Sequence, residues 1–246
     1  MRFAKRYMKP VGRVWYKIFT LGISSGITAL VACIMQVVMN NSLVYYGEKS
    51  PVTGDVALSA MGIVMKIAMI LASFCIGLGI GAQPILGFNL GAKKYRRVRK
   101  TYLMAVCAAT ICIFAGWAVC QIAPHLVLRL FGEENQNFTD FAVRCLRIYL
   151  GGIFCAGFQI VSTNYFQATG QPLKASLLSM LRQLILLIPL LLILPLYFGL
   201  DGLLYAGPCA DVASAVIVAL FIFPEMRKLQ RKIAESDTPV SASQAA

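Results

Sequence analysis

Charged residues are scarce in this 246-residue chain. They make up 13% of the sequence against 59% for hydrophobic residues, and the mean hydropathy is +0.73. Ordinary soluble domains are about 45–50% apolar and about 25% charged. The chain has too few polar residues to cover a water-exposed surface, which excludes a soluble globular domain and an intrinsically disordered protein. The composition therefore predicts an integral membrane protein.

Residues that carry enzyme chemistry are also few. The sequence has one histidine, His125, and its eight cysteines include no CxxC pair. A zinc site needs several cysteine or histidine ligands, and a catalytic triad needs a histidine beside its nucleophile. The glycine-rich run Gly77–Gly81 lies in an apolar helix with no strand before it, so it does not predict a dinucleotide-binding loop. We predict no enzyme activity, no metal site and no cofactor, and we interpret the cysteines as packing residues.

Six apolar stretches are long enough to cross a bilayer, which takes about 20 helical residues. We therefore predict an all-α integral membrane protein, a bundle of six transmembrane helices. The predicted helices cover residues 20–46, 56–88, 101–123, 141–168, 175–198 and 202–223. Residues 1–19 are predicted to be a basic cytoplasmic segment, and residues 224–246 a disordered cytoplasmic tail.

Lysines and arginines collect at one end of the predicted helices. Six lie in the N-terminal segment, six between the second and third helices, one is Lys174 and four follow the sixth helix, whereas the opposite loops hold four. Cytoplasmic loops of membrane proteins are enriched in these residues. We therefore expect both termini in the cytoplasm and the chain in the lipid bilayer of the plasma (inner) membrane. The net charge of +13 follows this pattern, so we do not predict a nucleic-acid partner.

Three charged residues fall well inside predicted helices: Lys66, Arg182 and Asp211. A charge at the centre of a bilayer costs at least ~2.5 kcal/mol, so such residues indicate an ion or substrate pathway or a structural ion pair. The predicted depths of Lys66 and Asp211 differ by only about 2 Å, at 1.5 Å of rise per residue. We hypothesise that these two residues pair, with cation binding by Asp211 as the alternative. For Arg182 the alternative is a side chain that snorkels to the inner face.

Polar uncharged residues supply further pathway candidates. Gln159, Thr163 and Gln167 are spaced four residues apart on the fourth predicted helix, so they share one face. A polar face on a membrane helix is directed to protein or to a water-filled cavity rather than to lipid. The remaining candidates are Asn164 on the same helix and Gln36 on the first.

Glycine pairs four residues apart recur in the apolar helices. They are Gly22 with Gly26, Gly77 with Gly81 and Gly87 with Gly91. This spacing puts two residues without side chains on one face and allows another helix to approach closely. We predict that the pairs are packing surfaces, with a hinge role as the alternative.

The run GAQPILGFNLGA, from Gly81 to Ala92, is followed by Arg96-Arg97-Val98. Together they resemble a signature of multidrug and toxic compound extrusion (MATE) transporters. The segments Leu21–Ser24, Leu130–Gly132 and Tyr165–Gly170 also resemble that family at corresponding places. The resemblance covers about residues 18–229. The signature residues are Gln83, Pro84, Gly87, Asn89, Gly91 and Arg97.

The resemblance implies one half of a transporter. Members of that family are built from two six-helix lobes related by an approximate two-fold axis. This chain resembles the C-terminal lobe alone. The resemblance further implies export of cationic, amphipathic small molecules by antiport with Na⁺ or H⁺. It also implies a partner, either a matching N-terminal six-helix lobe or a second copy. One branch of the family has acids on the first and fourth helices of this lobe, but here none lies between Lys17 and Glu48 or after Asp140 in the fourth.

Two other functions stay open at the level of sequence. A lipid-linked precursor flippase of a related superfamily would need a large, strongly cationic cavity, for which the chain offers Lys66, Arg182 and Arg144. An inactive, truncated transporter fragment with a structural role would need no pathway at all.

Overall fold

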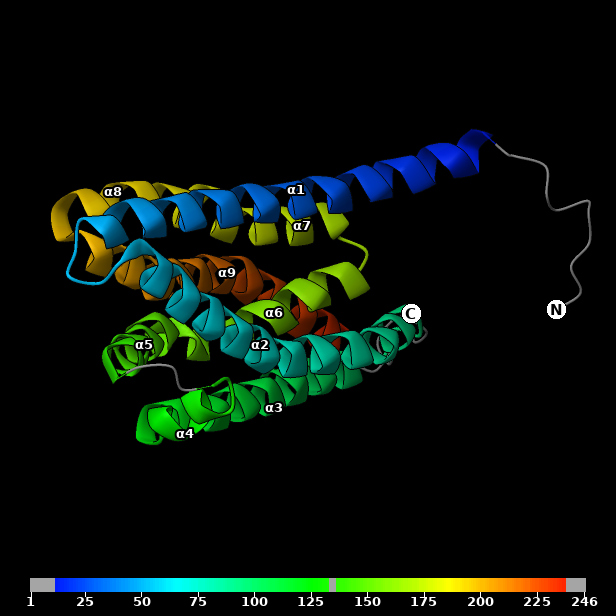
Figure 1. The fold of residues 1–246 in the computed structure, drawn as a ribbon. Helices are drawn as coiled ribbons and strands as arrows, with labels where there is room; N and C mark the ends of the chain where they lie inside the picture. The colour runs from blue at the N-terminus through cyan, green and yellow to red at the C-terminus, as the bar shows by residue number, and fades with distance from the viewer. Residues whose placement is uncertain (1–11, 133–135, 238–246) are drawn as a thin grey trace, which may run out of the picture.

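The computed structural model describes residues 12–132 and 136–237, and every regular element in this part of the chain is a helix (Figure 1). In chain order the helices are α1 (Gly12–Glu48), α2 (Gly54–Gly91), α3 (Tyr95–Ile122), α4 (Pro124–Arg129), α5 (Gln136–Tyr149), α6 (Phe154–Ala168), α7 (Pro172–Met180), α8 (Ile188–Phe198) and α9 (Leu200–Asp237). The prediction of an all-α membrane bundle is confirmed.

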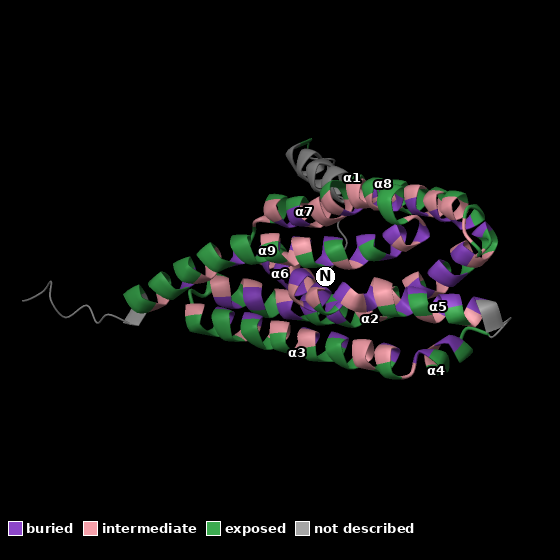
Figure 2. Ribbon diagram, turned by 90° about the vertical axis from the view of Figure 1, so that its left-hand side faces the viewer, coloured by how far each residue is buried: buried purple, intermediate pink, exposed green. Residues whose placement is uncertain are grey.

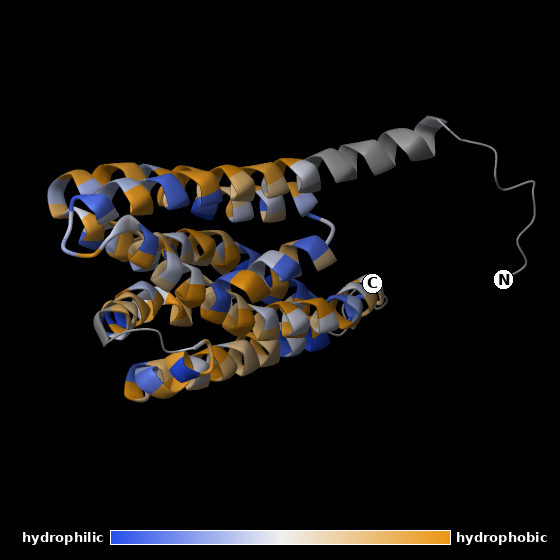
Figure 3. Cartoon of the chain, viewed as in Figure 1, coloured by the Kyte–Doolittle hydropathy of each residue, from blue (hydrophilic) through white to orange (hydrophobic). Residues whose placement is uncertain are grey.

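Five helical stretches in the described chain are long and apolar enough to cross a membrane. Helices α5 and α6 form a sixth if this bent pair is counted as one span. Large apolar side chains lie exposed on these helices. Hydrophobic residues predominate along the helices, as their orange colour in Figure 3 shows. Such side chains suit contact with lipid tails.

The fourth span differs from the unbroken helix predicted over residues 141–168. A 3-10 turn, Leu150–Gly152, separates α5 from α6, and the two helices meet at 45°. Two adjacent glycines weaken the helix at this point. Gly152 also lies against α9, where an added Cβ would come within 2.6 Å of the Pro208 Cα. The bend therefore coincides with a close contact between two backbones.

The fifth span also departs from a regular α-helix. A π-helical segment, Leu181–Leu187, joins α7 to α8, and the Ile188 N–H bonds to the Gln183 carbonyl five residues earlier. Pro189 follows directly, and a proline supplies no N–H for the residue four positions before it. A wider turn at this position accommodates the missing hydrogen bond. The π segment turns Arg182 toward α9, as described below.

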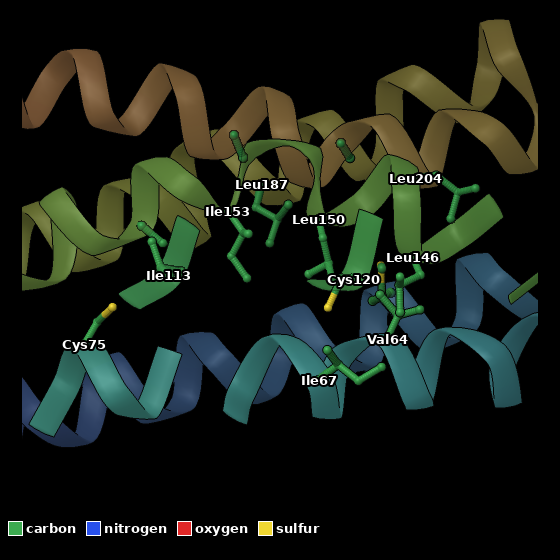
Figure 4. Packing of buried hydrophobic residues seen from close by; sticks show 14 of the residues in the cluster. Val64, Ile67, Cys75, Ile113, Cys120, Leu146, Leu150, Ile153, Leu187 and Leu204 are labelled. Atoms are coloured by element: carbon green, nitrogen blue, oxygen red, sulfur yellow. The ribbon is translucent and has the colours of Figure 1, made fainter. Parts of the chain in front are cut away.

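Helix α2 occupies the middle of the bundle. It packs against α1, α3, α5 and α6, while α9 packs chiefly against α5, α6, α8 and the π segment. Buried residues, coloured purple in Figure 2, recur along these helices. Figure 4 shows one such group, in which Val64 of α2, Cys120 of α3 and Leu146 of α5 lie close together. This apolar core fixes the faces on which polar side chains meet.

The start of α1, the α2–α3 turn and the end of α9 lie at the same end of the bundle (Figure 1). Helix α9 continues to Asp237, which corrects the prediction that the tail is disordered from residue 224. Ile222, Met226 and Leu229 recur at helical spacing and pack on the core, so this extension has an apolar face of its own. Residues 1–11 and 238–246 lie outside the described chain, so the remainder of both predicted terminal segments stays a prediction.

Candidate functional site

An ion pair inside the membrane-spanning part joins the π segment to α9. Arg182 lies 2.6 Å from the Asp211 carboxylate through Nη2, and its Nε donates a second hydrogen bond of 2.7 Å to the same oxygen. The Asp211 side chain is 6% exposed and that of Arg182 is 36% exposed. Two charged hydrogen bonds to one carboxylate oxygen make this a short, specific contact between the two elements.

Two uncharged side chains extend this ion pair toward α6. The Ser214 hydroxyl, one turn after Asp211, donates 3.0 Å to the Gln159 side-chain oxygen, and it also lies 2.9 Å from the Asp211 carbonyl. Both Ser214 and Gln159 are buried. We call Arg182, Asp211, Ser214 and Gln159 the buried polar cluster. Sequence reasoning missed Ser214, although its spacing of three residues from Asp211 on one helix could have indicated it.

The predicted pairing of Lys66 with Asp211 is wrong. The carboxylate is held by Arg182, whereas Lys66 lies on α2 beside Phe131 and Phe138, from the α4–α5 region. The two residues have similar depths, about 18 Å and about 17 Å along their own helices. Depth alone did not fix their partners, because α2 and α9 turn these side chains toward different neighbours. Within the described chain no ion pair involves Lys66.

A second polar cluster joins α2 to α6 nearer the α2–α3 turn. The Gln83 amide donates 2.8 Å to Asn164 and 3.1 Å to Gln167. Asn164 in turn donates 2.9 Å to the Ile160 carbonyl of its own helix. We call Gln83, Asn164 and Gln167 the amide cluster. It is partly exposed and carries no charge, so it can offer hydrogen bonds to a solute without binding a cation strongly.

The polar face predicted on residues 159–167 is divided between these two clusters. Gln159 points to α9 and Gln167 to α2, while the half-buried Thr163 bonds to the Gln159 carbonyl at 2.9 Å. The remaining candidate, Gln36, is exposed on α1 and donates 2.9 Å to Asn40. The structure therefore does not bring the predicted candidates together in one place.

The glycine pairs do not pack as predicted. A Cβ added at Gly26, Gly77, Gly81 or Gly91 would meet nothing within 4 Å, and one at Gly87 would make an ordinary contact with Ala168. The close approach is at Gly79 instead, where a Cβ would lie 2.4 Å from the Asn164 amide nitrogen. The missing side chain at Gly79 therefore makes room for the amide cluster. Gly22 lies among residues whose surroundings are not described.

The signature run forms the end of α2. Asn89 is buried, its side-chain amide donates 2.8 Å to the Ile85 carbonyl, and its own carbonyl accepts from the Lys94 N–H at 2.9 Å. Lys93 adopts a left-handed φ of 58° at this turn. Pro84 and Arg97 are exposed, and Gln83 belongs to the amide cluster. The signature thus combines a helix stop with one polar contact to α6.

One face of α2 remains open along most of its length. Its centre line carries residues three, four or seven apart that are small or polar. These exposed residues are Ser59, Gly62, Lys66, Ser73 and Gly77. Exposed apolar residues interrupt and flank this line: Met69 and Ile70 lie between Lys66 and Ser73, and Phe74 lies beside it. We call the five residues the α2 stripe.

A family model described as MatE matches residues 28–193 of this chain. The multidrug export protein MepA of Staphylococcus haemolyticus (strain JCSC1435) is 24% identical over 227 residues, which cover 92% of this chain and 48% of that protein. The MepA protein of Staphylococcus aureus (strain MSSA476) is 26% identical over 217 residues, 87% of this chain and 46% of that protein. The chain thus spans about half the length of the curated relatives it matches.

Solved structures share the fold over the same extent. An outward-facing multidrug resistance MATE transporter of the MOP superfamily superposes with a TM-score of 0.80 at 18% identity, covering 94% of this chain and 51% of that one. A MATE crystal structure in the bent conformation gives 0.81 at 18% identity, covering 95% and 50%. Members of the MATE family are transporters and not enzymes, in agreement with the prediction of no enzyme activity. Sequence and fold agree, and the chain belongs to the MATE family of membrane transporters.

Proposed function

We propose that this chain is the C-terminal lobe of a multidrug exporter in the plasma membrane. The exporter extrudes cationic, amphipathic compounds by antiport with Na⁺ or H⁺, and a matching N-terminal six-helix lobe or a second copy completes it. The α2 stripe is the observation that carries this proposal. The relatives of which this chain covers about half are named multidrug export proteins, which also supports the proposal.

The α2 stripe is unsuited to lipid. It presents hydroxyl groups, bare backbone at two glycines and an ammonium group about 18 Å along the helix. An exposed lysine at such a depth costs at least ~2.5 kcal/mol, whereas exposed apolar side chains cost nothing there. A surface of this kind favours a water-filled cleft or a second protein lobe. In the two-lobe arrangement, the stripe becomes one wall of the substrate pathway.

The coupling cation is expected to bind outside this lobe. Asp211 is the only acid well inside the described spans, and Arg182 already neutralises it. A second cation at that carboxylate would be repelled by the guanidinium group. We therefore assign the coupling carboxylate to a matching N-terminal lobe, which a second copy of this chain would not supply, and a structural role to the Arg182–Asp211 pair.

The flippase alternative loses two of its three cationic candidates. Arg144 pairs with Asp201 at 2.6 Å, and Arg182 pairs with Asp211. Lys66 is left as the single uncompensated cation of that set, which is too little for a strongly cationic cavity. This observation favours the drug exporter.

Drug resistance in a pump-deficient bacterial strain tests the proposal. We expect no increase in the minimal inhibitory concentration of ethidium when this chain is expressed alone. We expect an increase of at least fourfold when it is co-expressed with an N-terminal six-helix lobe taken from a MepA relative, because a cleft between two lobes needs both walls. Membrane levels of both chains are measured by immunoblot. No resistance at normal levels would favour the inactive fragment.

A further inference from the structure

A pocket lies at the outer end of the α2 stripe, between α2 and the α4–α5 region. It has a volume of about 370 Å³. The lining residues that matter for its chemistry are Ser59, Gly62, Ile63, Lys66, Phe131 and Phe138. Small-molecule sites in proteins are of about this size or larger and combine apolar walls with a few polar groups.

Among the described residues, none compensates the positive charge that Lys66 brings to this pocket. No described acid forms an ion pair with Lys66, and Asp55, the other charged residue of α2, lies about 16 Å away along the helix. Arg144 and Arg182 differ, because each has a carboxylate at 2.6 Å. Lys66 is exposed on α2. Inside the membrane-spanning part, its ammonium group beside two phenyl rings attracts anions more strongly than in bulk water.

We propose that this pocket binds the anionic group of an amphipathic aromatic compound, such as an aryl carboxylate or the carboxylate end of a zwitterionic drug. As a step in export, the inference rests on the proposed function. The ammonium group of Lys66 donates to one carboxylate oxygen, and the Ser59 hydroxyl, two turns away on the same face, donates to the other. The aromatic body lies against Phe131 and Phe138. Gly62 leaves the floor of the pocket open, because an added Cβ there would meet nothing within 4 Å.

Equilibrium dialysis with two matched probes tests the site. The full chain is placed in nanodiscs of zwitterionic lipid, and empty nanodiscs are subtracted as background. The probes are 2-naphthoate and neutral 2-naphthamide, which have the same rings and differ in charge. We expect saturable binding of 2-naphthoate that is about tenfold tighter than that of 2-naphthamide, as a charged hydrogen bond predicts.

Four variants assign the effect to the pocket. Lys66→Gln should bring the affinity for 2-naphthoate down to that for 2-naphthamide, and Lys66→Arg should keep most of the preference. Gly62→Leu should block both probes, because its side chain fills the open floor. Gly77→Leu is the matched control: it lies on the same face, its Cβ also meets nothing within 4 Å, and it is about 22 Å further along α2. Its binding should be unchanged.

Equal affinity for the two probes in the native chain would overturn the proposal. So would an unchanged preference in Lys66→Gln, or a Lys66→Gln variant whose melting temperature falls while it still prefers 2-naphthoate, because Lys66 would then be a structural residue. Binding by the lone chain is independent of transport. Loss of drug resistance in the co-expression experiment with intact 2-naphthoate binding would therefore overturn the exporter and leave the site standing.

Discussion

Single residues decide which polar groups meet in this lobe, and the ion pair on Asp211 is the clearest case. An acidic and a basic residue at the same depth form a pair only if their helices turn the two side chains toward each other. Asp211 faces the π segment and meets Arg182 at 2.6 Å, while Lys66 lies on the open face of α2. The charges within the buried polar cluster consequently cancel, whereas the open face of α2 carries the positive charge of Lys66.

A double-mutant cycle measures this difference. Arg182→Gln and Asp211→Asn should show a coupling energy of at least about 1 kcal/mol, because each single change leaves its partner charge uncompensated. The free energy of unfolding is measured by denaturant titration in mixed micelles. The control cycle combines Lys66→Gln with Asp211→Asn and should give a coupling energy near zero. Coupling in the control cycle, and none in the first, would restore the Lys66 pairing.

Gly79 provides a second test at the scale of one atom. Gly79→Ala should lower the free energy of unfolding by about 1–3 kcal/mol, because its Cβ displaces Asn164 and breaks the amide cluster. The matched control is Gly77→Ala, two residues away in the same helix with nothing within 4 Å of its Cβ. This control should be neutral or stabilising, since alanine favours the helix. Equal effects of the two changes would contradict the assigned contact.

At the scale of helices, the α5–α6 bend and the π segment position the residues around Asp211. The bend between α5 and α6 brings Gly152 against Pro208 of α9, next to the helix segment that carries Asp211. The π segment in the next span turns Arg182 toward the same helix. Two irregular spans therefore lie against Asp211, the one buried acid among the residues that the structure describes.

Gly152→Ala tests the packing of the bend. The added Cβ would lie 2.6 Å from a backbone atom of α9, which cannot rotate away as a side chain can. We expect a loss of about 2–4 kcal/mol in the free energy of unfolding or failure to accumulate in membranes. Gly151→Ala should be tolerated, because its Cβ meets nothing within 4 Å. Unfolding titration and membrane yield read out both variants, and a tolerated Gly152→Ala would mean that the bend is not packed as described.

The sequence predicted the six spans because long apolar runs carry a strong signal, and it predicted Gln159, Asn164 and Gln167 as polar positions. It could not predict the bend, since Gly151-Gly152 in an apolar run is compatible with a straight membrane helix. The end of α9 was missed because the sequence after residue 223 is mainly polar, and its apolar positions Met226 and Leu229 are isolated among charged residues. Partner identities, such as Arg182 for Asp211, depend on helix rotation, which depth and periodicity leave undetermined.

At the scale of the whole molecule, alternating spans place the start of α1, the end of α9 and the α2–α3 turn at the same end of the bundle (Figure 1). The α2–α3 turn, the first turns of α3 and the last turns of α9 together carry ten of the 19 described lysines and arginines, and they lie at one end of the bundle (Figure 3). The proposed orientation puts this end in the cytoplasm. The Lys66 pocket then lies in the outer half of the membrane.

Cysteine labelling tests the orientation. In a variant without native cysteines, Lys94→Cys and Lys228→Cys should be protected from an impermeant maleimide in intact cells and become labelled after permeabilisation. Glu134→Cys, in the opposite loop, should be labelled in intact cells. Labelling of position 94 from outside would reverse the orientation.

The central claim is that this chain forms one wall of a cleft and transports only when a second wall is present. Ethidium efflux from proteoliposomes tests it most directly, with the purified chain alone, a purified N-terminal lobe alone, and both together under an imposed Na⁺ or H⁺ gradient. The account predicts gradient-dependent efflux from the combined lobes and background leakage from either one. Full gradient-driven efflux from this chain without the N-terminal lobe would contradict the need for that lobe and indicate a functional dimer of two copies.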